Sequence, residues 1–235
     1  MDKSDLLTIR EVVETLGVSI DTLRRWDKQG KLHAFRFTPT GHRYYPKKEI
    51  YDLLPKDDIF LLAKDWVSNQ MPIDLPSDFY ADTNDIFNAR LEHMAKNLDP
   101  LIVAIAGEIG NNSFNHNIGN WPDVPGVFFG YDSDKKRVVL ADRGQGILKT
   151  LKRVIPELNN DKNALIVAFT EFISARAPEN RGNGLKFVRD VIINNNFSLL
   201  FQSGNAELRL KKGDKNLDIS ENNLYFRGCL VIINF

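Results

Sequence analysis

The sequence EIGNNSFNH, from Glu108 to His116, follows the apolar run of residues 101–106. Glu108 and Asn112 are four residues apart, so on a helix they share one face. Asparagine and glycine are poor helix formers, and this segment contains both, so its intrinsic helix propensity is low. The pattern favours a helix that projects a carboxylate and amides into a site. An asparagine-rich loop, or a helix end with solvated amides, is the alternative that these residues leave open.

Composition places the chain among ordinary globular proteins rather than disordered ones. The 235 residues are 43% hydrophobic, and 31 basic side chains balance 31 acidic ones. No charge imbalance points to nucleic acid, so any basic surface must be local. The single cysteine, Cys229, lies in an apolar run and is typical of a buried packing residue. No apolar run is long enough to span a membrane, and the sequence starts with no signal peptide, so we expect a cytoplasmic protein with no membrane partner.

Residues 8–30 have the signals of two short helices. Thr8 and Glu11 have the spacing of a capping box, and Gly17 stands where a left-handed cap ends the first helix. Ser19 is then a typical N-cap for a second helix, which we expect over residues 20–29. Two short helices joined by a tight turn predict a helix-turn-helix.

The next residues predict a basic wing. Residues 32–37 and 42–45 have the composition of two strands, and residues 38–41 have that of a turn. From Thr22 to Lys48 there are eight basic residues and one acidic residue, so the local net charge is eight minus one, or +7. Cations with interleaved aromatic side chains suit a surface that follows phosphates. This part of the chain therefore predicts binding to double-stranded DNA.

Residues 19–32, followed by residues 41–45, resemble the winged helix-turn-helix of MerR-type regulators and excisionase-like proteins. The resemblance covers about residues 6–54 and implies that the helix after Ser19 enters the major groove. Pro55 follows where full-length MerR regulators have a long dimerising helix, so dimerisation by that route is not expected. A basic winged module that binds protein stays as an alternative. The resemblance assigns these residues to DNA: Ser19, Thr22, Arg24, Arg25, Lys28, Arg43 and Tyr45.

A connector follows over residues 55–77, with helical spacing of its apolar residues between 59 and 67, and a further helical pattern covers residues 78–98. The predicted domains are therefore residues 1–54, 55–77 and 78–235. The apolar face of the connector helix suits docking on either domain or on a second copy of the chain.

The last predicted domain contains two glycine motifs. The first, residues 142–147 (DRGQGI), follows a predicted hairpin of residues 126–131 and 137–141. A carboxylate followed by two glycines lets the backbone approach a planar ligand, although the same motif also forms ordinary turns. The second, residues 181–185 (RGNGL), precedes a helical pattern and would form an anion site at the helix start. A glycine cap before a surface helix is its alternative.

The order of these three segments resembles the ATP-binding domain of the GHKL superfamily, which includes gyrase, histidine kinases and MutL. The resemblance spans roughly residues 79–235, and the form Arg-Gly-x-Gly-Leu is closer to the anti-sigma-factor serine kinases. It implies ATP and Mg²⁺ as ligands, with Asn112 ligating Mg²⁺, Glu108 acting on the attacking water, and a lid from residues 148–180. Lys186 stands where the family often has glycine. The implied ATP-binding residues are Asn112, Asn115, Asp142, Gly144, Gly146, Ile147, Arg181, Gly182, Gly184, Leu185 and Lys186.

Together the resemblances predict an α+β protein with a winged helix-turn-helix and a two-layer α/β sandwich built on a mixed sheet, the Bergerat-type fold. The predicted function is that of an ATP-binding and DNA-binding transcriptional regulator, in which nucleotide state changes the binding of DNA or of a partner. Two alternatives stay open: an ATPase or anti-sigma-type serine kinase targeted by its winged helix, and a non-catalytic nucleotide-binding interaction module. A protein partner or a homodimer is compatible with each.

Overall fold

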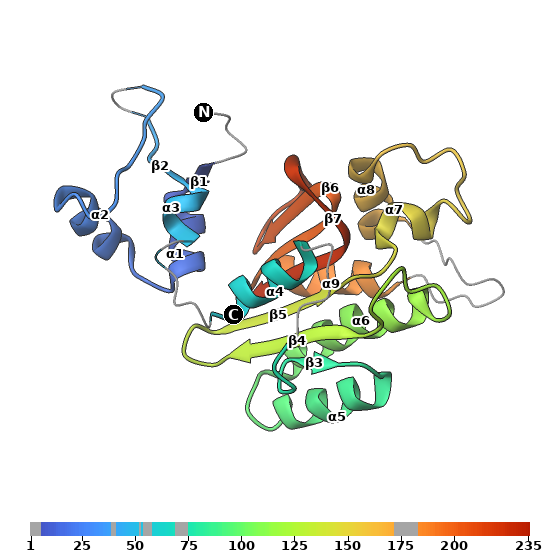
Figure 1. Cartoon of the computed structure of the whole chain (residues 1–235). Helices are drawn as coiled ribbons and strands as arrows, with labels where there is room; N and C mark the ends of the chain where they lie inside the picture. The colour runs from blue at the N-terminus through green and yellow to red at the C-terminus, as the bar shows by residue number, and fades with distance from the viewer. Residues whose placement is uncertain (1–5, 39–40, 52, 54–57, 69–74, 172–182) are drawn as a thin grey trace. The chain divides into compact units, whose positions relative to one another are not determined.

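The computed structural model describes residues 6–38, 41–51, 53, 58–68, 75–171 and 183–235. Contacts divide the chain into two compact units, Met1–Leu61 and Leu62–Phe235. The division falls within helix α4 (Ile59–Ser68), which occupies the helical part of the predicted connector. Figure 1 labels the helices and strands of the two units.

The first unit is a small helical domain with a two-stranded sheet. Its elements are β1 (Leu6–Thr8), α1 (Ile9–Leu16), α2 (Ile20–Lys28), β2 (Tyr44–Pro46) and α3 (Lys47–Tyr51). Strands β1 and β2 pair antiparallel, and their register places Leu7 opposite Tyr45. The buried side chains of its core are Leu7, Val12, Leu23, Leu32, Tyr45 and Ile50.

Local capping signals in this unit are confirmed. The Thr8 hydroxyl accepts from the Glu11 backbone N–H, and the Glu11 carboxylate accepts from the Thr8 backbone N–H at 2.5 Å. Gly17 ends α1 in the left-handed region with a φ of 66°. The Ser19 hydroxyl then caps α2 by accepting from the Thr22 backbone N–H. Since these signals involve residues at most a few positions apart, the sequence alone specifies the helix-turn-helix.

The predicted strand over residues 32–37 is wrong. Among the described residues of the wing, a single pair forms, in which Phe35 and Tyr44 exchange backbone hydrogen bonds of 2.7 and 2.8 Å. The Ala34 backbone N–H donates to the Asp27 carboxylate instead of joining a ladder. On the other side of the wing, residues 44–46 pair with β1, a strand that the sequence analysis missed.

The second unit combines one sheet with helices. Its described elements after α4 are β3 (Tyr80–Ala81), α5 (Asn84–Met94), α6 (Pro100–Asn117), β4 (Val127–Asp132), β5 (Arg137–Asp142), α7 (Gly146–Leu151), α8 (Asp161–Thr170), α9 (Gly184–Asn194), β6 (Ser198–Lys211) and β7 (Asp218–Asn234). The predicted hairpin of β4 and β5 and the helix α9 are confirmed.

The sheet has the order β3-β4-β5-β7-β6, and every described strand pair in it is antiparallel. The α+β class is therefore confirmed, whereas the predicted mixed sheet is wrong. Short turns join β4 to β5 and β6 to β7, and short turns can join only antiparallel strands. The pairs β3–β4 and β5–β7 are antiparallel as well, across longer connections that contain helices. The long β6–β7 hairpin was not predicted.

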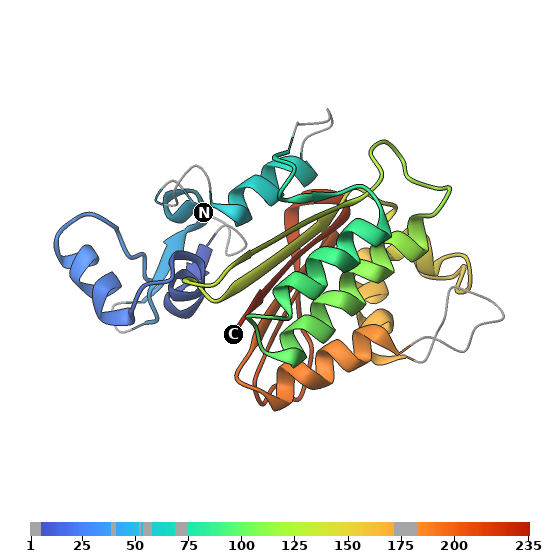
Figure 2. The same cartoon turned by 90° about the horizontal axis from the view of Figure 1, so that it is seen from below.

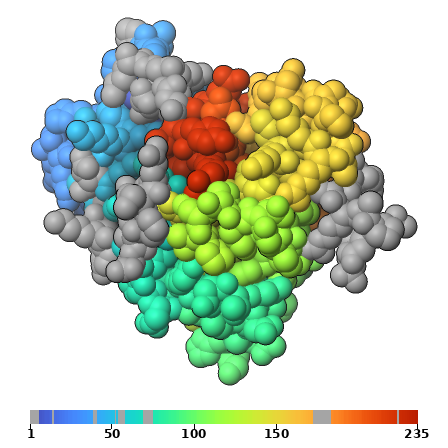
Figure 3. Space-filling model, turned by 45° about the vertical axis from the view of Figure 1, so that its right-hand side comes forward, coloured from blue at the N-terminus to red at the C-terminus, as the bar shows by residue number. Residues whose placement is uncertain are grey.

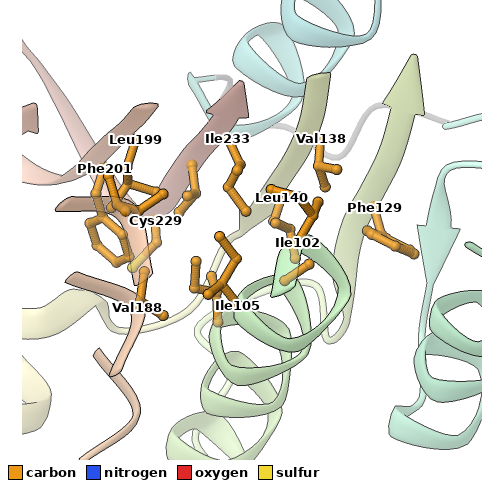
Figure 4. Close-up of a cluster of buried hydrophobic side chains, with 14 of the residues drawn as sticks. Ile102, Ile105, Phe129, Val138, Leu140, Val188, Leu199, Phe201, Cys229 and Ile233 are labelled. Carbon is orange, nitrogen blue, oxygen red and sulfur yellow. The ribbon is translucent and has the colours of Figure 1, made fainter. Parts of the chain in front are cut away.

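Helices α5, α6 and α9 lie side by side on one face of this sheet (Figure 2). Between the layers lies an apolar core in which Ile102 and Ile105 of α6 and Val188 of α9 meet the strands (Figure 4). Helix α6 continues to Asn117, so the asparagine-rich segment is helical and its loop alternative is wrong. Gly110 belongs to this packing, because a Cβ there would lie 2.1 Å from the Phe87 ring of α5.

Candidate functional site

The predicted DNA-binding face of the first unit is centred on α2. Leu23 is buried beneath this helix, whereas Arg24, Arg25 and Lys28 are exposed. Arg24 pairs with Asp21 at 3.2 Å, but both side chains are mostly exposed, so this pair contributes little to stability. Three cations are thus accessible along one helix.

Ser19 and Thr22 mark the start of the same helix. The Ser19 Oγ accepts from the Thr22 backbone N–H at 3.1 Å and lies 3.0 Å from the Thr22 hydroxyl. Both hydroxyls therefore serve the cap in the free protein. A backbone phosphate at this end would also meet the positive end of the helix dipole.

Asp27, the only acidic residue in the basic stretch, ties the wing to α2. Its Oδ2 accepts from Arg43 Nε at 3.2 Å, and its Oδ1 accepts from the Ala34 backbone N–H at 3.1 Å. Arg43 is therefore part of the internal structure as well as a predicted phosphate contact. The sequence analysis missed this role of Asp27, although a lone acid among eight cations is a signal that could have indicated it.

The prediction that Tyr45 contacts DNA is wrong. Its side chain is 0% exposed and lies in the core of the unit. Burial raises the pKa of Tyr45, as does the nearby Asp27 carboxylate, whereas Arg43, Arg36 and Arg24 lower it. Because all three arginines lower the pKa of the same hydroxyl, the cations of α2 and of the wing lie near one another. Strand alternation places Tyr44 on the opposite face, where it is only half-buried.

In the second unit, the C-terminal half of α6 lies against the glycine motif of residues 142–147. The Ser113 hydroxyl donates to Asp142 Oδ2 at 2.8 Å, and the Gly144 backbone N–H donates to Asp142 Oδ1 at 2.8 Å. Asp142 is only 2% exposed and lies opposite Cys229 of β7. These hydrogen bonds fix a buried carboxylate at the end of a strand.

Burial raises the pKa of Asp142 above the ordinary value of 3.8, and hydrogen bonds from Ser113, Gly144 and Cys229 oppose part of that rise. The folded state therefore holds this proton more tightly than the unfolded chain. The stability that Asp142 contributes is then greatest at low pH and falls as the pH rises from about 3.8 through the raised pKa.

This behaviour gives a pH-dependent prediction for Asp142→Asn, which removes the titration. We expect the free energy of unfolding of the wild type, minus that of the variant, to fall by roughly 1.4 kcal/mol per pH unit between the two pKa values. Above the raised pKa the difference should be constant. Urea unfolding of both proteins across that interval measures it, and a difference independent of pH would contradict the assignment.

The two glycines of this motif pack closely against the protein itself. A Cβ at Gly144 would lie 2.2 Å from Asn117 Nδ2, and one at Gly146 would lie 2.5 Å from the Arg227 carbonyl oxygen. Gly146 also has a φ of 76°. The Ile147 backbone N–H donates to the Ser203 hydroxyl at 3.0 Å, and its side chain packs against the core. These residues shape the loop that carries Asp142.

Glu108 and Asn112 meet the first turn of α9. A Cβ at Gly184 would lie 2.5 Å from Glu108 Oε2 and 3.3 Å from Asn112 Nδ2. Within the described parts of the chain, neither side chain has a hydrogen-bond partner, and Glu108 is exposed. Asn183 caps α9 without a side-chain hydrogen bond, so the cap does not use the first-turn amides. Three predicted residues from two segments, α6 and the start of α9, are thus brought together.

Other predicted residues lie elsewhere or serve the structure. Lys186 is buried, its ammonium donates to the Glu171 carbonyl at the end of α8, and desolvation lowers its pKa. That contact makes Lys186 a structural residue, contrary to its predicted contact with nucleotide. Leu185 packs against the core, and Asn115 is half-buried on α6. Arg181 and Gly182 lie outside the described residues, as do residues 172–180 of the predicted lid.

Arg143, which the sequence analysis did not assign, anchors the same loop. It is 2% exposed, its Nη1 donates to the Trp66 carbonyl at 2.6 Å, and its Nη2 lies 2.6 Å from Asp123 Oδ2. Asp123 also pairs with Arg227 of β7 at 2.5 Å. In the space-filling view, the loop after α6, the α7 region and part of β7 meet on one face (Figure 3). Asp123 and Trp66 lie 20 and 77 positions from Arg143, so no local pattern signals this network.

No group of three or more histidine, cysteine, aspartate or glutamate side chains in the described residues could hold a metal ion. No described helix is both long and apolar enough to cross a bilayer.

Comparison with known proteins supports the helix-turn-helix. Residues 8–45 match the family described as MerR family regulatory protein. The chain is also similar to the type II methyltransferase M.Eco47II of Escherichia coli, with 37% identity over 59 residues, which is 25% of this chain. That match spans 14% of the methyltransferase. The family match lies within the first unit, which therefore carries a MerR-like helix-turn-helix.

Proposed function

We propose that the protein is a DNA-binding regulator in which α2 lies in the major groove of double-stranded DNA. The observation that carries this proposal is the row of exposed cations on α2, Arg24, Arg25 and Lys28, within residues that match the MerR family. When these cations contact phosphates, counterions condensed on the duplex are released, which favours binding. A phosphate bound at the capped start of α2 would fix the position of the helix along the duplex.

Substitution of Arg25 tests the DNA-binding proposal. We expect Arg25→Ala to weaken binding to a short mixed-sequence duplex and to reduce the slope of log K against log salt by about 1, the effect of one lost phosphate contact. Fluorescence anisotropy at several salt concentrations measures both quantities. Lys212→Ala, an exposed cation of the second unit, is the control and should leave affinity and slope unchanged. Equal behaviour of the two variants would remove α2 from the interface.

We also propose that the second unit binds ATP. In this proposal the Asp142 carboxylate accepts a hydrogen bond from the exocyclic amine of adenine, while the first turn of α9 receives phosphate oxygens. The support is convergence, because α6 is in contact with the loop of Asp142 through Ser113 and with Gly184 through Glu108 and Asn112. An adenine nucleotide presents an exocyclic amine and phosphate oxygens. A buried carboxylate can accept a hydrogen bond from the amine, and the free amides at a helix start can donate to the phosphates.

The same residues fit Mg²⁺. Asn112 offers an amide oxygen that no described residue uses, beside the exposed carboxylate of Glu108. Mg²⁺ bound with a nucleotide takes one or two oxygen ligands from the protein and the rest from phosphates and water. When bound, the ion would neutralise phosphate charge that the Glu108 carboxylate would otherwise repel.

Finally, we propose that nucleotide binding changes DNA binding. The loop of Asp142 is joined through Arg143 to the carbonyl of Trp66 in α4, and the chain passes from one unit to the other within α4. A ligand that holds Asp142 differently from the free protein would thus act on the segment that connects the units. The coupling requires only that the ligand binds one arrangement of this loop more tightly than the other.

A further inference from the structure

Three aromatic side chains of the wing form a cluster. The Phe35 and Phe37 ring centroids are 5.2 Å apart at an interplanar angle of 87°, and those of Phe37 and Tyr44 are 5.3 Å apart at 70°. Phe35 is 43% exposed and Phe37 is 53% exposed. We call Phe35, Phe37 and Tyr44 the aromatic cluster.

The backbone explains why these rings share one face. Phe35 and Tyr44 form the single bridge of the wing, so their side chains lie on the same side, and Phe37 is two positions from Phe35. Tyr45, the next residue, points into the core instead. None of the three rings is among the buried residues of the core of the first unit or the partly buried side chains packed against that core. Edge-to-face contacts hold the rings in place while leaving much of their apolar surface in water.

The charge around the cluster limits what can cover it. No acidic residue occurs between Lys28 and Lys48, a stretch that contains the whole cluster. Arg36 stands between the two phenylalanines in sequence, and Arg43 precedes Tyr44. An apolar surface within a cationic stretch suits a partner whose anionic groups can pair with the arginines while an apolar surface between those groups packs against the rings. Duplex DNA has this combination in its minor groove, where apolar side chains can insert at a base step between two rows of phosphates.

We infer that the aromatic cluster is a wedge that packs against the sugars and a base step in the minor groove, beside the major-groove site of α2. The inference rests on the proposed DNA binding and adds a contact that is apolar and therefore largely independent of salt. Phe37 has the most exposed ring and enters furthest. Arg36 and Arg43 hold the flanking phosphates, and the wedge favours sequences with a pyrimidine–purine step, which unstacks most easily.

The test uses the full-length chain and duplexes selected from a mixed-sequence pool by the wild-type protein, with 2-aminopurine next to each pyrimidine–purine step. For the double variant Phe35→Ala/Phe37→Ala we expect affinity to fall about tenfold, from the lost burial of two half-exposed rings, with an unchanged salt slope. The wild type should raise 2-aminopurine fluorescence at one step, and the double variant should not. Leu53→Ala, an exposed apolar residue of the same unit outside the cluster, is the control and should behave as wild type.

Several outcomes would overturn the inference. Wild-type affinity and fluorescence in the double variant would show that the rings do not touch DNA, while the proposed DNA binding would stand. Altered sedimentation of the double variant with unchanged DNA affinity would assign the cluster to a second copy of the chain. No duplex binding by the wild type would overturn the proposed function and this inference together. Unchanged thermal unfolding of the double variant confirms that the variant is folded.

Discussion

Gly228→Ala is expected to lower the free energy of unfolding of the second unit by about 3 kcal/mol or more. A Cβ at Gly228 would lie 1.9 Å from the Asp142 carbonyl oxygen and 2.7 Å from Asp142 Oδ1. The neighbour cannot move aside easily, because Asp142 is paired across the sheet with Cys229. The substitution must therefore either separate β5 from β7 or displace the candidate site. Urea unfolding followed by far-ultraviolet circular dichroism measures the loss.

Gly119→Ala is the matched control for this experiment. Gly119 has a φ of 70°, but an added Cβ would meet no atom within 4 Å. Its substitution should cost only the backbone strain of a left-handed alanine, about 1 kcal/mol. If the two variants lose the same small amount of stability, Asp142 and Gly228 are not in the close contact that the structure describes.

Asp142→Asn is expected to weaken ATP binding by about 10- to 100-fold, the equivalent of one lost hydrogen bond to a charged group. The substitution preserves size but replaces one carboxylate oxygen by an NH₂ group. Ser113 and Gly144 donate to different oxygens of Asp142, so the new NH₂ must face one of these donors or turn toward the ligand. Either arrangement removes an acceptor that the adenine amine or the loop requires. Isothermal titration calorimetry with Mg·ATP measures the affinity.

The control for this prediction is Asp134→Asn in the exposed turn between β4 and β5. It changes the net charge by the same amount and should bind ATP as the wild type does. Wild-type affinity in Asp142→Asn would show that the adenine contact is assigned to the wrong residue, and circular dichroism of both variants verifies that they are folded.

The sequence predicted those features that depend on neighbouring residues. The capping box of Thr8 and Glu11, the left-handed Gly17 and the N-cap of Ser19 all involve short-range contacts, and each is confirmed. The helix around Asn112 was also predictable, because the buried positions of α6 keep helical spacing. The structure places Glu108, Asn112 and Gly184 together, and their assignment to a nucleotide stays a prediction.

Features that depend on distant residues were missed or wrong. Strand composition alone did not show that Asp27 would bind the Ala34 backbone N–H and thereby keep residues 32–37 out of a strand. Tyr45 was assigned to DNA because basic and aromatic residues surround it in sequence, but pairing of β2 with β1 directs its ring inward. The network around the buried Arg143 joins four segments, and only the folded chain reveals it.

We expect a nucleotide bound near Asp142 to alter DNA binding by the first unit. The Kd of the full-length chain for a short duplex, measured with and without saturating Mg·ATP, tests this coupling. We expect salt-dependent binding and a change in Kd of about fivefold or more on adding Mg·ATP, in the range typical of coupled sites. This change should be lost in Asp142→Asn. An identical Kd with and without Mg·ATP, under conditions where calorimetry shows that the nucleotide is bound, would contradict the coupling.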